Sequence, residues 1–189
     1  MAELCVLVNG YYTVETNVVC ATITLIRDNG VNIVVDPGTV PDQQIIISAL
    51  AREYLTLDDI GYVFITHSHL DHYRNIGMFA RAKSLDYWGL WDGHSYIYNT
   101  MSRNFSNDIF IQMTPGHSYD NITLFVKTTA GIYAVCGDVF WDKNGPKIDT
   151  LAQDNDRLLK SREIILKKAD YIVPGHGDVF ASKDISILL

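Results

Sequence analysis

Apolar residues in this chain gather into short runs that are rich in β-branched side chains. Such runs predict strands, here at residues 4–8, 18–26, 31–35, 62–65, 95–98, 109–113, 122–126, 132–136 and 171–173. The Asn29–Gly30 pair between the second and third runs is typical of a β-hairpin turn. The pattern therefore predicts that sheets form much of the core.

Longer stretches between these runs carry helix signals. Pro41 and Asp42 suit the first turn of a helix that we expect to reach about Tyr54. A short helix is expected near Asp71, and the letters TLAQ at residues 150–153 resemble a capping box that opens a helix to about residue 169. Strands and helices that alternate, with hairpins among them, predict a layered α/β domain.

Length and composition narrow the class of protein. The chain has 189 residues, of which 48% are hydrophobic and 20% are charged. We expect one globular domain over residues 1–189, and this composition excludes a disordered or collagen-like chain. The 22 acidic residues outnumber the 15 basic ones, which excludes a dominant basic surface for nucleic acid but leaves room for a local basic patch.

Cysteine content and hydropathy bear on where the protein works. Its cysteines, Cys5, Cys20 and Cys136, are odd in number and too few for a disulfide framework. No apolar run approaches the roughly 18 residues that a membrane-spanning helix needs. We therefore expect a soluble, cytoplasmic protein with no membrane partner.

Histidines carry the candidate chemistry. Three of the six histidines fall in the pattern H-x-H-x-D-H, directly after a predicted strand. On extended backbone, His67 and His69 point the same way and can reach one common point, whereas Asp71 and His72 can turn to a second point beside it. Imidazole and carboxylate suit zinc, and also iron or manganese. Four ligand-type residues in six positions exceed the needs of one catalytic metal, which predicts two.

Three later residues fit the same chemistry. His117, Asp138 and His176 each follow a predicted strand and each stand directly after a glycine. Loops at strand ends are where an α/β scaffold presents functional groups, and glycine lets the backbone approach a metal closely. The sixth histidine, His94, lies outside this pattern, and we expect it to be an ordinary loop residue.

The order H-x-H-x-D-H, G-H, G-D and G-H resembles the metallo-β-lactamase superfamily over nearly the whole chain. This resemblance implies a four-layer αββα sandwich with the metals at one edge. It implies one metal on His67, His69 and His117. It implies a second metal on Asp71, His72 and His176, with Asp138 bridging the two. Asp36 resembles the structural aspartate of the family's first motif.

Two departures from the family pattern affect the function. Arg74 stands where many members have glycine. We expect it to face solvent or to form a structural ion pair; the alternative is that it helps to bind an anionic substrate. Members that hydrolyse antibiotics commonly have cysteine in the position of Asp138 and no histidine in the position of His72. A dedicated antibiotic-hydrolysing role is therefore disfavoured.

The function predicted is that of a metal-dependent hydrolase with two Zn²⁺ ions per chain. A hydroxide that bridges the metals would attack an ester, thioester, lactone or phosphodiester. Asp138 would bridge the metals and orient this hydroxide, and Asp71 would accept its proton. Small ester or thioester molecules are the expected substrates. The tyrosines at residues 11–12 and the segments 37–40 and 87–94 are candidates for substrate contacts.

Alternatives remain open at this stage. The resemblance includes endoribonucleases, and residues 143–168 hold seven basic residues against four acidic ones; this segment suits either RNA binding or a solvated amphipathic helix. Another class is an iron-dependent sulfur oxidoreductase of the same fold, which metal analysis would separate from a zinc hydrolase. Trp88, Trp91 and Trp141 suit either core packing, which we favour, or the interface of an oligomer.

Overall fold

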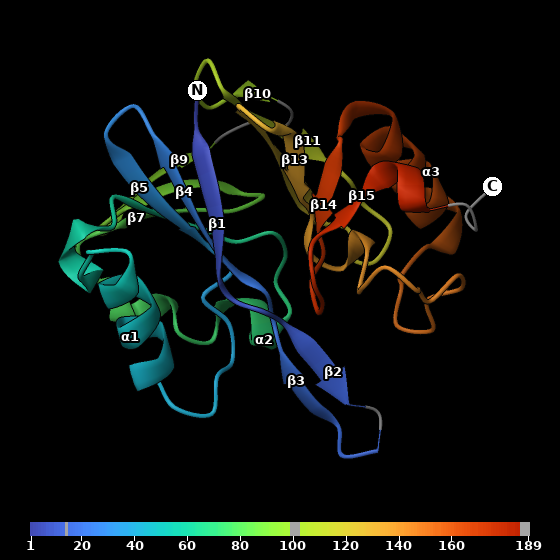
Figure 1. Ribbon diagram of the computed structural model, residues 1–189, viewed down its shortest axis with the longest axis horizontal. Coiled ribbons are helices and arrows are strands. Elements are labelled where there is room, and N and C mark those ends of the chain that lie inside the picture. The colour runs from blue at the N-terminus through green and yellow to red at the C-terminus, as the bar shows by residue number, and fades with distance from the viewer. Residues whose placement is uncertain (14, 99–102, 186–189) are drawn as a thin grey trace.

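The computed structural model describes residues 1–13, 15–98 and 103–185. Two β-sheets face each other, with α1 covering the outer face of one and α3 the outer face of the other (Figure 1). This is the predicted four-layer αββα sandwich. The helices are α1 (Gln44–Arg52), α2 (Leu70–Tyr73) and α3 (Asn155–Lys168), with short 3-10 turns η1 (Leu57–Asp59), η2 (Ile76–Met78), η3 (Gly137–Val139) and η4 (Ser182–Asp184).

Within the described residues, the strands form two large sheets and one small one. The first sheet has the spatial order β1 (Glu3–Val8), β4 (Ile23–Asp28), β5 (Val31–Val35), β6 (Tyr62–Phe64), β7 (Lys83–Leu85), β8 (Gly89–Asp92) and β9 (Ser95–Tyr98). The second has the order β10 (Arg103–Asn104), β11 (Ile109–Met113), β12 (Ile122–Thr128), β13 (Gly131–Val135), β14 (Tyr171–Val173) and β15 (Phe180–Ala181). The small sheet pairs β2 (Tyr11–Thr13) with β3 (Val18–Cys20).

Neighbouring residues on a strand point to opposite faces, which divides the core into layers. On β5, Val34 packs with the α1 residues Ile46 and Leu50, whereas Val35 packs with Leu124 of the opposite sheet. A third buried cluster joins the outer face of the second sheet to α3. Continuous apolar runs are therefore required on strands that are covered on both faces.

The chain direction brings several strand ends to one edge of the sandwich. β6 runs parallel to β5, and β14 runs parallel to β13. The segments that follow β6, β13 and β14, together with the one after β11, meet beside α2. They are joined across the sheets, since the amide of Ile122 donates to the carbonyl of Thr66 and the amide of Thr22 donates to the carbonyl of Gly175.

Two sequence predictions about elements are wrong in detail. The strand expected at residues 18–26 is divided into β3 and β4, because Thr22 leaves strand pairing to bond Gly175. The helix expected from residue 150 begins at Asn155, with the carboxylate of Asp154 accepting the amide of Arg157 as its cap. Among the described residues, no helix is long and apolar enough to cross a membrane.

Candidate metal centre

The seven candidate residues come from four separate segments of the chain. His67 and His69 follow β6, and Asp71 and His72 lie on α2. The others come from the second sheet: His117 after β11, Asp138 on η3 after β13, and His176 after β14. The structure brings all seven together in two adjoining groups.

The first group consists of three ring nitrogens and one carboxylate oxygen. His69 Nδ1 lies 3.0 Å from His67 Nε2 and 2.9 Å from His117 Nε2. Asp138 Oδ2 lies 3.3 Å from His117 Nε2 and 4.0 Å from His67 Nε2. His69 is half-buried and the other three residues are buried, so this group is reached from solvent on the side of His69.

The second group lies on the other side of the same carboxylate. Asp71 Oδ2 lies 3.7 Å from His72 Nε2 and 3.5 Å from His176 Nε2. Asp138 Oδ1 lies 3.1 Å from each of these two ring nitrogens. Asp138 Oδ2 also lies 3.3 Å from His176 Nε2. The Asp138 carboxylate therefore lies between the two groups, with Oδ2 next to both and Oδ1 next to the second.

Protein groups hold the second ring nitrogen of four of these histidines. This arrangement fixes the ring orientation and leaves the other nitrogen directed at the centre. The contacts are His67 Nδ1 to Thr66 Oγ1 at 3.1 Å, His72 Nδ1 to Asp36 Oδ2 at 2.8 Å, His117 Nδ1 to Asp149 Oδ2 at 2.6 Å and His176 Nδ1 to the carbonyl of Cys20 at 3.1 Å.

Burial governs the ionisation of the cluster. Burial, together with the nearby His72 and His117, lowers the pKa of His67 well below its usual value. Burial also lowers the pKa of His69. The neutral imidazole is the form that binds a metal. Burial opposes charge on His72 and Asp138, yet their mutual attraction raises the pKa of His72 and lowers the pKa of Asp138.

Two buried atoms at the middle of the cluster lie 3.1 Å apart but form no hydrogen bond with any group of the described residues. They are His72 Nε2 and Asp138 Oδ1. A buried polar atom without a partner costs free energy, and a divalent cation between these groups would satisfy both. Imidazole nitrogens and carboxylate oxygens are donors suited to zinc and also to iron or manganese. The residues present therefore fit a metal site.

Comparison with known proteins gives the family. The model of the metallo-beta-lactamase superfamily matches residues 19–112. Metallo-beta-lactamase domain-containing protein 1 of Xenopus laevis is 30% identical over 167 residues, which covers 84% of this chain and 71% of the relative. The chain belongs to the metallo-β-lactamase superfamily. The predicted enzyme class, a metal-dependent hydrolase, is confirmed at the level of this superfamily.

Further relatives and solved structures agree with this assignment. A Methanocaldococcus jannaschii protein named "Probable metallo-hydrolase" is 32% identical, covering 84% of this chain and 86% of its own length. Metallo-beta-lactamase domain-containing protein 1 of Mus musculus is 33% identical to this chain, which spans 60% of the length of that relative. Among solved structures, a Thermotoga maritima protein of the metallo-beta-lactamase type has a TM-score of 0.75 at 19% identity, covering 95% of this chain and 99% of that one. At this identity the likeness shows the fold alone.

Glycines of the superfamily motifs make room for the cluster. A Cβ at Gly175 would collide with Asp138 Oδ1. Gly137 has a positive φ of 54°, and a Cβ there would meet the Thr66 side chain. The sequence prediction that glycines permit close approach at this centre therefore has a definite physical basis at these two positions.

Asp149 holds the His117 ring of the candidate metal centre, a role that the sequence did not indicate. Its Oδ2 accepts from the indole of Trp141 at 3.1 Å besides contacting His117, and its Oδ1 accepts the amide of Leu151. Hydrogen bonds from these groups outweigh burial and lower the pKa of Asp149. Asp149 could not be found from the sequence because no motif surrounds it. Its role depends on the contact with His117, which lies 32 residues away in the chain.

Other residues singled out in the sequence lie away from the candidate metal centre. Arg74 is exposed, and His94 is exposed in the turn between β8 and β9. Trp88 and Trp91 are 44% and 41% exposed, so the core packing favoured for them is wrong. Cys136 is fully buried beside β14 and belongs to neither group of candidate metal residues.

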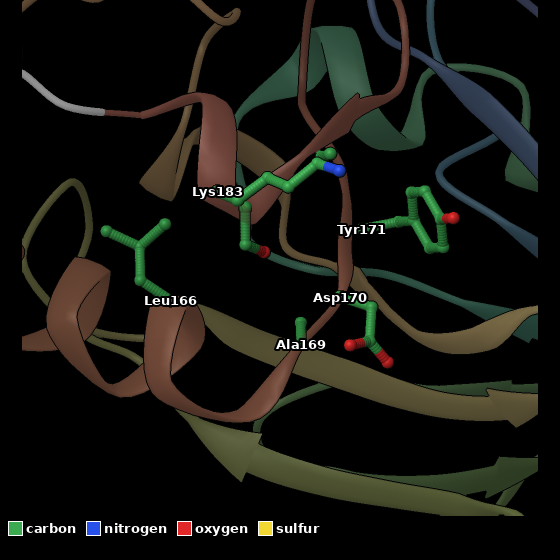
Figure 2. A pocket seen from close by; sticks show the side chains of 7 residues that line it. Leu166, Ala169, Asp170, Tyr171 and Lys183 are labelled. Carbon is green, nitrogen blue, oxygen red and sulfur yellow. The ribbon is translucent and has the colours of Figure 1, made fainter.

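Two surface cavities differ in their relation to this site. One of about 520 Å³ includes His176 in its lining. Another of about 390 Å³ lies beside the start of β14, where Figure 2 shows Asp170, Tyr171 and Lys183 around it. His176 follows the opposite end of β14. The cavity of Figure 2 is therefore separate from the candidate metal centre.

Proposed function

We propose that this chain is a two-zinc hydrolase of carboxylic esters, thioesters or lactones. His67, His69 and His117 would hold one metal. Asp71, His72 and His176 would hold the other, and Asp138 would bridge them. The whole of residues 1–189 would act as one domain, because the proposed ligands come from both halves of the chain.

The Asp138 carboxylate is the observation that carries this proposal. This carboxylate lies between the two groups: Oδ2 is 3.3 Å from both His117 Nε2 and His176 Nε2, and Oδ1 is 3.1 Å from His72 Nε2 and His176 Nε2. A carboxylate between two cation-binding groups suits two metals side by side. A single structural metal would not require the second group.

Zinc ions bound here would polarise a substrate oxygen and lower the pKa of a water molecule toward neutrality. The residues of the chain would do the rest. Asp138 would fix the spacing of the two groups, and His72, held by Asp36, would keep its orientation during turnover. The Asp71 side chain is 20% exposed, so its carboxylate can accept a proton from water at the edge of the site.

Ester chemistry is favoured over RNA because of how the basic segment folds. The structure pairs three basic side chains with carboxylates and buries a fourth: Lys143 with Asp184, Arg157 with Asp154, Lys167 with Glu163, and Arg162 inside the fold. A strip of free positive charge for a phosphate backbone is therefore weakened. Endoribonuclease activity remains an outcome of the test below.

Metal identity separates the hydrolase from the redox alternative. Zinc supports hydrolysis, whereas iron would support the sulfur oxidoreductase alternative. One solved structure of the same fold, a chemotaxis sensor, is described as a peroxy diiron species, with a TM-score of 0.70 at 15% identity. We further propose a cytoplasmic location, because three cysteines without a framework suit a reducing compartment.

The test combines metal analysis with a substrate screen. Purified protein is assayed for zinc, iron and manganese by mass spectrometry, and then for hydrolysis of nitrophenyl esters, thioesters, lactones and single-stranded RNA. We expect two zinc ions per chain and hydrolysis of at least one acyl substrate that stops on chelation and returns with zinc. Cleavage of RNA alone, or iron with no hydrolysis, would overturn the proposal.

A further inference from the structure

A cavity of about 520 Å³ opens directly beside the candidate metal centre. It is lined by His176, by Tyr12 from β2, and by Trp141 and the segment that follows it. The Tyr12 and Trp141 rings meet edge to face at 5.5 Å. Trp141 lies 6.3 Å from the His176 ring and 6.2 Å from the His117 ring. A ligand in this cavity would therefore contact His176 of the second group and the Trp141 ring, which lies next to His117 of the first.

The mouth of the cavity exposes large aliphatic side chains. Ile148 is 71% exposed and Leu151 is 61% exposed, and both line the cavity with Pro146. A single exposed apolar side chain is ordinary, but several around one hollow indicate a binding surface. The cavity volume falls in the range of small-molecule sites, which are mostly apolar.

The wall of the cavity is held in place by buried contacts. Arg162 is 1% exposed and donates to the carbonyls of Val139 and Lys147, at 2.8 and 3.1 Å. Further along, Asp149 is held by the indole of Trp141. The segment between these anchors is therefore fixed before a ligand arrives, which lowers the entropic cost of binding.

The charge of the lining selects against anions. Among the described residues that line the cavity, Asp142 and His176 are the ionisable ones apart from Tyr12, and none is Lys or Arg. Lys143 next in the chain is directed to Asp184, 3.2 Å away. Apart from a metal held beside His176, no cation of the lining would offset the Asp142 charge toward a carboxylate or phosphate in this cavity.

We propose that this cavity binds the uncharged, apolar acyl chain of the substrate, with the scissile carbonyl placed beside His176. The proposal rests on the acyl hydrolase proposed above and names its substrate class. Tyr12, Trp141, Ile148 and Leu151 contact the chain, and Asp142 rejects acyl groups that end in a carboxylate.

The first experiment measures chain-length dependence with the zinc-loaded protein. Nitrophenyl acetate, butyrate and hexanoate are compared with the hemisuccinate, whose chain ends in a carboxylate. We expect kcat/KM to rise about two- to fourfold per added methylene, the factor that corresponds to burying one CH₂ group. The hemisuccinate should be at least about tenfold slower than the butyrate.

Variants locate the effect in the cavity. The double variant Ile148→Ala, Leu151→Ala should flatten the chain-length dependence and leave zinc content near that of the wild type. Ile97→Ala on β9 is the matched control, because Ile97 is 59% exposed and lies outside this lining. Asp142→Asn keeps the oxygen that accepts the amides of Asn144 and Gly145, and it should speed the hemisuccinate about three- to tenfold relative to the butyrate.

A binding measurement separates this proposal from the proposed function. N-methylhexanamide, an uncharged amide with a six-carbon acyl chain, is titrated by calorimetry into the zinc-loaded protein and the double variant. We expect binding that weakens about tenfold in the double variant and is unchanged in Ile97→Ala. Such binding without hydrolysis of any acyl substrate would overturn the hydrolase and leave the cavity assignment standing. Ester hydrolysis with no chain-length dependence and no amide binding would overturn the cavity assignment alone.

Discussion

Four of the five histidines of the candidate centre have an orientation that is fixed by what touches the outer ring nitrogen. His117 is held by a carboxylate, His67 by a hydroxyl and His176 by a main-chain carbonyl. His69 differs, since it turns Nδ1 rather than Nε2 toward the centre. The residue patterns of the sequence predict which side chains converge but not which nitrogen each one presents.

Asp138→Asn tests the bridge. The amide is nearly isosteric, so the fold should survive, but it lacks the negative charge that two cations need between them. We expect the second zinc to be lost and hydrolysis to fall at least about 10- to 100-fold. Metal content, circular dichroism and activity check this, with the exposed Asp156→Asn as control. A variant with both metals and full activity would refute the bridging role.

Asp149→Asn tests the group that holds His117. An amide there would point its NH₂ at two donors, the His117 ring and the Trp141 indole, which now share Oδ2. We expect zinc affinity at the first site to fall about 10- to 100-fold while the second site changes little. Competition with a zinc chelator measures both sites. Trp141→Phe keeps the His117 contact, and equal zinc loss in that variant would contradict this role.

Cys136→Ser tests whether the buried thiol near the centre is structural. Cys136 Sγ lies 3.5 Å from the carbonyl of Val173, and burial raises its pKa well above the usual value, so it stays a thiol at pH 7. We expect zinc content to be unchanged and the free energy of unfolding to fall by about 1–2 kcal/mol. Half-exposed Cys5→Ser is the control. Loss of one zinc per chain would show that the proposed ligand set is incomplete.

Among the elements, α3 contributes to the site without supplying a candidate ligand. Its buried Arg162 bonds main-chain carbonyls on both sides of the segment that carries Trp141. Arg162 contributes to the basic surplus of residues 143–168 in the sequence, because charge counts along a helix do not show which side chain turns inward. Leu158 and Ile165 of the same helix are buried as well, which fits an amphipathic helix.

Arg162→Met tests this support. The change keeps an unbranched apolar side chain but removes the guanidinium that lies over the Phe140 ring and leaves two carbonyls without their donor. We expect a loss of about 2–4 kcal/mol in the free energy of unfolding and faster hydrogen exchange over residues 139–147. Denaturant unfolding and exchange mass spectrometry measure these effects. Lys160→Met, on an exposed position of the same helix, should change neither; equal exchange in the two variants would contradict the anchoring role.

At the scale of the whole molecule, local pattern predicted a layered α/β domain and most of its longer strands, whereas the four-layer sandwich was implied by the family resemblance. It missed short strands such as β2, β7 and β8, whose pairing depends on neighbours distant in sequence. It also placed the start of α3 five residues too early. The letters at residues 150–153 resemble a cap, but Asp149 binds the amide of Leu151 and keeps the chain in a loop until Asp154.

Metal stoichiometry tests the molecule as a whole. We expect two zinc ions in the wild type, with His117→Ala losing mainly the first and His176→Ala mainly the second. Zinc at 100 times its Kd adds about 2.7 kcal/mol of stability, so chelation should lower Tm by roughly 5–10 °C. Calorimetry and metal analysis check both values. A wild type that holds only one metal in excess zinc would contradict the two-metal proposal.

The position of the cluster between the sheets has a consequence beyond catalysis. His69 follows β6 of the first sheet and His117 follows β11 of the second, 48 residues further along the chain, yet they would share one metal. Such a metal is a removable cross-link, comparable to a disulfide that closes a long loop. The zinc supply of the cell would then set how long the folded molecule survives between synthesis and proteolysis, because the two halves separate more readily once the ion has left.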